Sequence, residues 1–233
     1  MRVRNIVILA GTCILLSLFL NMIEPRKTQI RIFDAQIDKT YKNEKVPFIL
    51  CLFIVYACPL IILFYMFRRY KHPKVENTVY FYFVLSIMLN MMITDSLKVM
   101  VGRQRPDYIY RTQLKHNSWF LKQFHIREGR KSFPSGHTSC TLNGIVFFNG
   151  ICYIKANLKP FNDMPIRKNN LCKLTLNASS IIIALFIPIS RFVDHKHHIS
   201  DIIAGALIGC FSSLVALKIL SKKLQTCTEM YEN

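Results

Sequence analysis

The chain has 233 residues, of which 52% are hydrophobic, and a formal net charge of +18. An ordinary soluble domain with this much charge would be less apolar, and here the apolar residues are gathered in blocks. In a soluble protein such an excess of positive charge would indicate nucleic-acid binding. The basic residues fall between the apolar blocks, however, which fits lipid headgroups or an anionic substrate better than nucleic acid. No two of the eight cysteines stand out with zinc-ligand or disulfide-framework spacing.

Six apolar runs have the length, or nearly the length, needed to cross a bilayer. They cover residues 6–23, 47–67, 78–101, 139–154, 174–189 and 199–220. The first run is not followed by a small-residue cleavage pattern, so we expect an uncleaved signal anchor. The fourth run is short and somewhat polar. We therefore predict an all-α fold, a six-span transmembrane helix bundle that forms a single integral-membrane domain over residues 1–233.

Six crossings place alternate connecting segments on opposite membrane faces. The amino terminus, two basic connections at residues 68–74 and 155–173, and the tail from Ser221 share one face. Basic residues on that face crowd the ends of the spans, which favours the cytosol for both termini, although the bias is modest. We expect a multi-pass protein of an endomembrane or the plasma membrane. The long connection 102–134 interleaves aromatic and basic residues, which predicts a cap at the lumenal or extracellular interface.

The connection between the fifth and sixth runs carries an unusual concentration of ionisable residues. It contains Arg191, Asp194, His195, Lys196, His197, His198 and Asp201. Ionisable groups at membrane depth are costly and usually functional. If the chain is helical from residue 199, His197 and Asp201 share a face, so the carboxylate can hold one ring nitrogen and leave the other free as a base or nucleophile. A polar loop among headgroups is the plain alternative, and the neighbouring cations argue against a metal site.

Two other segments emerge on the same face and supply groups that suit a phosphate. Lys98 and Arg105 flank the end of the third run, and with Arg191 they give three cations for a doubly charged oxyanion. Ser135 and Gly136 lead into the fourth run, where exposed backbone N–H groups and the positive end of a helix dipole can face that anion. Glycine allows the backbone to approach it closely.

The two remaining groups have the chemistry for phosphoryl transfer. His197 can attack phosphorus, and His137 can protonate the leaving oxygen. Taken singly, each of these features has an ordinary explanation, because a lysine near a span end usually snorkels and a lone histidine is more often structural. Their occurrence together on one membrane face is what predicts a phosphate site.

The three segments carry a pattern with fixed internal spacing. It reads Lys98-x6-Arg105-Pro106, then Pro134-Ser135-Gly136-His137, then Ser190-Arg191-x5-His197-x3-Asp201. The pattern resembles the three-part phosphatase signature of the type 2 phosphatidic acid phosphatase superfamily, and it is complete at every signature position. The sequence around these motifs, at residues 102–107 and 131–139, most resembles the eukaryotic lipid phosphate phosphatases within that superfamily.

The resemblance implies a membrane enzyme that hydrolyses phosphate monoesters through a phosphohistidine, without a cofactor, a metal or added magnesium. In that scheme His197 is the nucleophile, Asp201 stabilises its imidazolium, and His137 serves as the acid. Lys98, Arg105, Ser135, Gly136 and Arg191 hold the phosphoryl oxygens. The expected substrates are phosphatidic acid, lysophosphatidic acid or diacylglycerol pyrophosphate within the bilayer. A sphingoid-base phosphate, an isoprenyl pyrophosphate or a soluble sugar phosphate would fit the same residues.

Three other functions fit part of the same pattern. A non-catalytic protein that binds lipid phosphates would be expected to have lost His137 or His197, and this chain keeps both. An anion channel would spread cations along several spans, whereas only Lys98 lies well inside one. A phosphotransferase that passes the group to another alcohol uses the same chemistry, and the sequence does not distinguish it from a hydrolase.

Overall fold

The computed structural model describes residues 3–28, 35–70, 73–113, 118–157 and 170–232. Within those ranges the secondary structure is entirely helical. The helices are α1 (Val3–Met22), α2 (Phe48–Leu52), η1 (Phe53–Ala57), α3 (Cys58–Tyr70), α4 (Pro73–Val101), α5 (Tyr108–Gln113), α6 (Trp119–Gly129), α7 (Gly136–Asn157), α9 (Asn170–Val193) and α10 (Ile199–Glu232). The predicted all-α fold is therefore confirmed.

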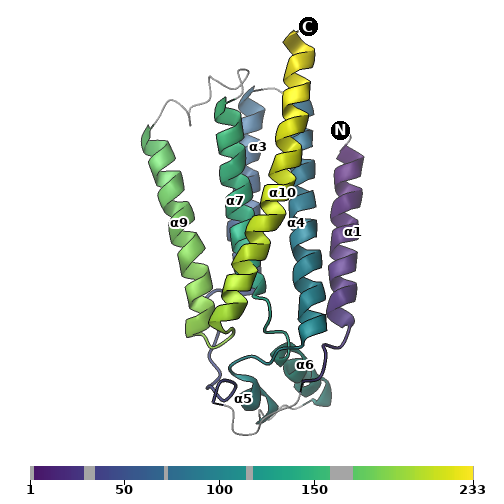
Figure 1. The fold of residues 1–233 in the computed structure, drawn as a ribbon, viewed down its shortest axis with the longest axis vertical. Helices are drawn as coiled ribbons and strands as arrows, with labels where there is room; N and C mark the ends of the chain where they lie inside the picture. Colours follow the sequence, from purple (N-terminus) through teal and green to yellow (C-terminus); the bar gives the residue numbers. More distant parts are fainter. Residues whose placement is uncertain (1–2, 29–34, 71–72, 114–117, 158–169, 233) are drawn as a thin grey trace.

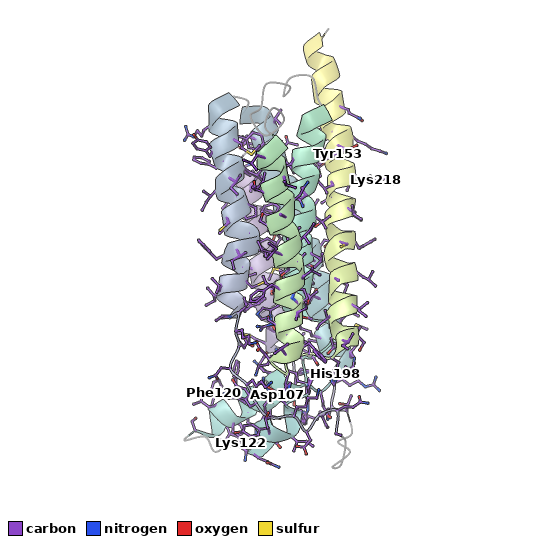
Figure 2. All side chains as sticks on the ribbon, turned by 90° about the vertical axis from the view of Figure 1, so that its left-hand side faces the viewer. Asp107, Phe120, Lys122, Tyr153, His198 and Lys218 are labelled. Carbon is purple, nitrogen blue, oxygen red and sulfur yellow. The ribbon has the colours of Figure 1, made fainter. Side chains whose placement is uncertain are left out.

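The long helices run side by side, and the short helices α5 and α6 lie across one end of the bundle (Figure 1). Helix α10 packs against α7, α4 and α9, and α1 packs against α4. The first turn of α1 and the last turn of α10 lie at the end opposite α5 and α6. We call residues 102–134 the cap. Figure 2 shows Phe120 and Lys122 at the cap end, far from Tyr153 and Lys218.

Five helical segments are long and apolar enough to cross a membrane. They are Arg4–Met22, Phe48–Arg68, Val75–Val101, Leu174–Val193 and Ile199–Gln225. Many of their apolar side chains face outward, as lipid-facing residues should, among them Leu15, Ile49, Ile182 and Leu207. The chain is thus a multi-pass membrane helix bundle.

The sixth crossing stays a prediction, because α7 is less apolar than the other five. Helix α7 nevertheless lies within the bundle and contacts α4, α9 and α10. Its polar residues near the cap are buried, including Thr138, Ser139, Thr141 and Asn143. Side chains that face protein rather than lipid do not need to be apolar, which explains the low hydropathy of this helix.

Several observed helices are longer than the predicted runs: α4 begins at Pro73 rather than at residue 78, α7 covers Gly136–Asn157 rather than 139–154, and α9 covers Asn170–Val193 rather than 174–189. Helix α10 continues to Glu232, beyond the apolar run that ends at Leu220. The second span contains the π-helical turn η1, which lies directly before Pro59 in α3. Proline lacks an N–H and its ring collides with the carbonyl one turn back, and a π-helical turn accommodates that conflict. Most of the predicted basic connection 155–173 lies outside the described residues.

A buried amide joins four helical segments in the middle of the bundle. The Asn143 Nδ2 of α7 lies 2.7 Å from Ser86 Oγ of α4 and 2.9 Å and 2.8 Å from Ser212 Oγ and Ser213 Oγ of α10. The Tyr56 hydroxyl of η1 donates to Asn143 Oδ1 at 3.1 Å. Hydrogen bonds of this kind join transmembrane helices that have no hydrophobic force between them.

Two glycines allow α10 to approach the beginning of α7. A Cβ on Gly205 would collide with the carbonyl oxygen of Ser135, and one on Gly209 would collide with that of Ser139. Small residues four apart permit such close backbone contact between membrane helices. This contact holds the carboxyl-terminal end of the cap, which leads into α7, against the first turns of α10.

We predict that Gly205→Ala and Gly209→Ala each lower the midpoint of thermal unfolding in detergent, because the added methyl group has no space and overpacking typically costs about 1–3 kcal/mol. The matched control is Gly11→Ala, since a Cβ there has nothing within 4 Å. That variant should keep or slightly raise the midpoint, because alanine favours the helix. Equal effects of all three substitutions would contradict the close contact.

Candidate active site

A cavity of about 440 Å³ lies where the bundle meets the cap. Five of the eight predicted site residues line it, namely Lys98, Arg105, Gly136, His137 and His197. The other three, Ser135, Arg191 and Asp201, are buried. Ser135 precedes Gly136, Arg191 Nη1 lies 3.3 Å from His137 Nε2, and Asp201 Oδ2 lies 3.9 Å from His197 Nδ1. The three segments that carry the sequence pattern therefore meet in one place.

The His197 imidazole is buried and held by one ring nitrogen. Its Nδ1 lies 2.7 Å from the carbonyl oxygen of Ser132, in the cap. A carbonyl only accepts, so Nδ1 carries the hydrogen and donates it. Nε2 then has a free lone pair, and the side chain lines the cavity. Burial, with Arg105 and His137 nearby, holds the pKa of His197 well below its usual 6.5.

The Asp201 carboxylate does not make the direct hydrogen bond that the sequence predicts. Its Oδ2 is 3.9 Å from His197 Nδ1. The carboxylate accepts instead from Ser132 Oγ at 2.6 Å, from Arg103 Nη1 at 2.6 Å and from the His198 N–H at 2.9 Å. Asp201 therefore orients the imidazole through Ser132, whose hydroxyl it binds and whose carbonyl holds the ring.

The last of those bonds also explains how α10 begins. His198 is the residue before the helix and Asp201 is its third residue, so the bond from the His198 N–H to the carboxylate is one half of a capping box. Arg103 also donates to Ser200 Oγ at 2.7 Å. Neither Ser132 nor Arg103 was among the predicted site residues, although they lie in the stretches 131–139 and 102–107 that resemble the lipid phosphate phosphatases.

His137 has two partners for the same ring nitrogen. Its Nε2 is 3.1 Å from the Val46 carbonyl and 3.3 Å from Arg191 Nη1. A protonated Nε2 can donate to the carbonyl, whereas an unprotonated one can accept from the guanidinium. The edge of the Phe48 ring lies against the imidazole, with 5.1 Å between centroids. The site therefore offers a partner for each protonation state of Nε2.

Arg191, in the last turn of α9, is fully buried. Its Nη2 donates to Asp194 Oδ2 at 3.1 Å and its Nε to Ser190 Oγ at 3.2 Å. On the cavity side, its Nη1 lies 3.6 Å from Glu44 Oε2. Sequence analysis did not single out Glu44, a cavity-lining carboxylate. It lies beside the cation where an anionic substrate would be expected.

Lys98 and Arg105 supply the other two cations. Lys98 Nζ pairs with Asp95 Oδ1 at 3.3 Å. The same Nζ lies 3.0 Å from the position that a Cβ on Gly136 would occupy, so the absence of a side chain brings this ammonium to the first turn of α7. The buried Nε of Arg105 has no hydrogen-bond partner among the described residues. An unsatisfied buried donor is costly and points to a missing acceptor.

Ser135 is the residue before α7 and forms its amino-terminal cap. Its Oγ lies 3.0 Å from Thr138 Oγ1 and 3.5 Å from the Thr138 N–H, both of which donate to it. The Ser135 N–H is occupied by the Asp201 carbonyl at 3.0 Å. The predicted contact with an anion therefore falls to the Ser135 hydroxyl hydrogen, not to its backbone.

The other two histidines of the 190–201 segment point to separate backbone carbonyls. His195 Nδ1 lies 3.0 Å from the Thr40 oxygen, and His198 Nε2 lies 3.1 Å from the Gln104 oxygen. His197 binds a third carbonyl, so the three rings do not converge. Among the residues that the structure describes, no group of three or more His, Cys, Asp and Glu side chains is disposed to hold a metal ion.

A buried ion network fastens the 190–201 segment to the cap. Lys196 Nζ donates to Asp107 Oδ2 at 3.0 Å, and Arg111 donates to both oxygens of the same carboxylate at 2.7 Å and 2.9 Å. Burial alone would raise the pKa of Asp107, but Arg111 and Lys196 lower it on balance. The carboxylate therefore stays ionised and fixes Lys196, the neighbour of His197.

Comparison with known proteins gives a consistent result. The PAP2 superfamily matches residues 79–225. The chain is 33% identical over 214 residues to probable lipid phosphate phosphatase 4 of Arabidopsis thaliana, an alignment that covers 84% of this chain and 66% of the relative. It is 34% identical over 135 residues to lipid phosphate phosphatase 1 of the same plant, covering 54% and 39%.

A further relative, probable diacylglycerol pyrophosphate phosphatase 1 of Schizosaccharomyces pombe, is 32% identical over 138 residues, covering 53% of this chain and 47% of the relative. The chain thus spans between 39% and 66% of the length of these three relatives. No solved structure matches it. The matched region contains all three signature segments and more than half of the chain, and the protein belongs to the PAP2 superfamily.

Proposed function

We propose that the protein is an integral-membrane lipid phosphate phosphatase that forms a phosphohistidine on His197. The observation that carries the proposal is the presence of His137 and His197 in one cavity with Lys98 and Arg105. The names of the relatives, which include lipid phosphate phosphatases, support the same activity. Both termini are assigned to the cytosol and the cavity to the lumenal or extracellular face.

The substrate phosphate is held by cations and by the beginning of α7. Arg105 and Lys98 bind its oxygens, and Arg191 exchanges part of its contact with Glu44 for the phosphate. The Ser135 hydroxyl and the Gly136 N–H complete the set at the positive end of the helix dipole. Charge-assisted hydrogen bonds of this kind are the strong ones in proteins, and preorganised cations stabilise the charge that develops in phosphoryl transfer.

The reaction proceeds in two displacements at phosphorus. The lone pair of His197 Nε2 forms a P–N bond while the bond from phosphorus to the alcohol oxygen breaks, and His137 delivers its proton to that oxygen. Water then attacks phosphorus with His137 as the base. The P–N bond breaks, inorganic phosphate leaves, and His197 regains its lone pair. Ser132 and Asp201 hold the ring in line throughout. The protein's own cations neutralise the charge on the phosphoryl group, so we expect the enzyme to be active without magnesium.

The lining of the cavity fits an amphiphile with its phosphate at the membrane interface. Leu18 of α1, Phe48 of α2 and Met91 of α4 contribute apolar side chains to the lining, each from a membrane-spanning segment. Phosphatidic acid, lysophosphatidic acid and diacylglycerol pyrophosphate could leave their acyl chains in the bilayer while the headgroup enters. A soluble sugar phosphate has no acyl chain that would contact these apolar side chains.

We predict that His197→Ala and His137→Ala each lower the turnover of phosphatidic acid by at least about 10²-fold, the usual loss when an acid–base or nucleophilic group is removed. The measurement is phosphate release by purified protein in mixed micelles containing EDTA. His195→Ala is the matched control, since that ring contacts the Thr40 carbonyl and does not line the cavity as His197 does, and it should stay near wild type. Wild-type turnover by either variant would show that the roles are wrongly assigned.

The same assay tests the metal-free mechanism, because wild-type activity should persist in EDTA. Abolition of wild-type activity by EDTA, with rescue by a divalent metal, would contradict that mechanism.

The pH profile should report the lowered pKa of His197. Burial and the nearby Arg105 disfavour the imidazolium, so the nucleophile is neutral at pH 7 and is lost only when the pH falls through that lowered pKa. We predict that the acidic limb of kcat/KM lies well below pH 6.5 in the wild type. In Arg105→Gln one disfavouring charge is gone, so the limb should move to higher pH. Comparing the two proteins on one substrate cancels the ionisation of the substrate. A limb that stays in place or moves to lower pH would argue against His197 as the titrating group.

A further inference from the structure

The cavity extends past the three signature segments to helix α6 of the cap. Phe124, Arg127 and Glu128 of that helix line it, together with Lys131 just beyond its end. None of these residues belongs to the three-part phosphatase signature, although Lys131 is the first residue of the stretch 131–139 that resembles the eukaryotic lipid phosphate phosphatases. The site therefore has a second basic side that the proposed mechanism does not use.

Arg127 is oriented towards the cavity but lacks a full set of acceptors. Its buried Nε has no hydrogen-bond partner among the described residues. Its guanidinium lies 5.9 Å from the centre of the Phe124 ring, one turn earlier on the same helix. A contact of that kind holds a planar cation in place without satisfying its N–H groups. The one other arginine with an unsatisfied buried Nε in the described part of the chain is Arg105.

The neighbouring cations of the cavity are already paired. Lys131 Nζ donates to Glu128 Oε1 at 2.7 Å and lies 3.2 Å from Asn21 Oδ1 of α1. Lys98 pairs with Asp95. These pairs leave Arg105 and Arg127 as two cations with open donor capacity on one cavity. Two such donors fit a ligand that carries two anionic groups.

We propose that Arg127 forms a second phosphate subsite that binds the inner phosphate of a lipid diphosphate. The inference rests on the proposed phosphatase function and adds a preference to it. The terminal phosphoryl group would lie at His197 and Arg105. A cavity of about 440 Å³ has room for a diphosphate headgroup, since ligand pockets generally span about 300–1,000 Å³.

This arrangement places Arg127 next to the leaving group. When His197 Nε2 bonds to the terminal phosphorus, the bond to the bridging oxygen breaks, and that oxygen departs with the lipid monophosphate. Negative charge then develops on the inner phosphate, where Arg127 can stabilise it. Water cleaves the P–N bond as before. A monophosphate substrate has no inner phosphate, so its hydrolysis should depend little on Arg127.

The test compares Arg127→Gln with wild type on diacylglycerol pyrophosphate and on phosphatidic acid in the same micelles. Because hydrogen bonds to charged groups are the stronger ones in proteins, we expect kcat/KM for the diphosphate to fall at least about tenfold. The value for phosphatidic acid should stay within about twofold. The matched control is Lys122→Gln, which removes one positive charge from the exposed side of the same helix (Figure 2) and should change neither value. Equal losses on both substrates, or no loss on the diphosphate, would overturn the subsite.

A binding measurement separates this inference from the proposed activity. Calorimetry on purified protein would give the affinities of inorganic pyrophosphate and inorganic phosphate without any turnover. We expect Arg127→Gln to weaken pyrophosphate binding about tenfold or more while phosphate binding is unchanged, and Arg127→Lys to restore part of it. That result in a protein without phosphatase activity would refute the proposed function and leave the subsite standing. Full phosphatase activity of the wild type, together with unchanged pyrophosphate binding by Arg127→Gln, would refute the subsite and leave the proposed function standing.

Discussion

The hydrogen bond from His197 Nδ1 to the Ser132 carbonyl is the interaction on which the site depends. It fixes which ring nitrogen carries hydrogen and therefore which one faces the cavity. Asp201 supports it indirectly, by accepting a hydrogen bond from the Ser132 hydroxyl and by capping α10. One carboxylate thus sets the beginning of the helix and the direction of the nucleophile together. A change that moved the cap relative to α10 would alter the chemistry even with every signature residue in place.

Contacts elsewhere in the fold hold His197 and the Ser132 carbonyl in position relative to each other. Gly205 and Gly209 let α10 lie directly against the beginning of α7, so Ser135 and Asp201 share a backbone hydrogen bond. The Asn143 network fixes the same helices further inside the bundle. The Lys196–Asp107 pair ties the 190–201 segment to the cap. Three kinds of interaction, close backbone contact, buried amide bonding and a buried ion pair, therefore hold one imidazole relative to one carbonyl.

Sequence reasoning predicted the all-α fold and the grouping of Lys98, Arg105, Gly136, His137 and His197, because apolar runs and their alternation decide which segments share a membrane face. It assigned Asp201 directly to His197, since spacing alone cannot show that a carbonyl intervenes at 2.7 Å. It missed Ser132 and Glu44 for a similar reason: one acts through its backbone, and the other reaches the site only through tertiary contact. The weak apolar character of α7 also has a tertiary cause, since its polar face is buried among helices rather than exposed to lipid.

The central claim is that His197 carries the phosphoryl group, and trapping that intermediate tests it most directly. Wild-type protein would be mixed briefly with phosphatidic acid labelled in its phosphate, quenched in alkali, in which phosphohistidine is stable, and then digested and mapped by mass spectrometry. We predict an acid-labile phosphate on His197, with none on a His197→Ala protein treated in the same way. Label on another residue, or rapid phosphate release with label on no residue at any quench time, would contradict the account.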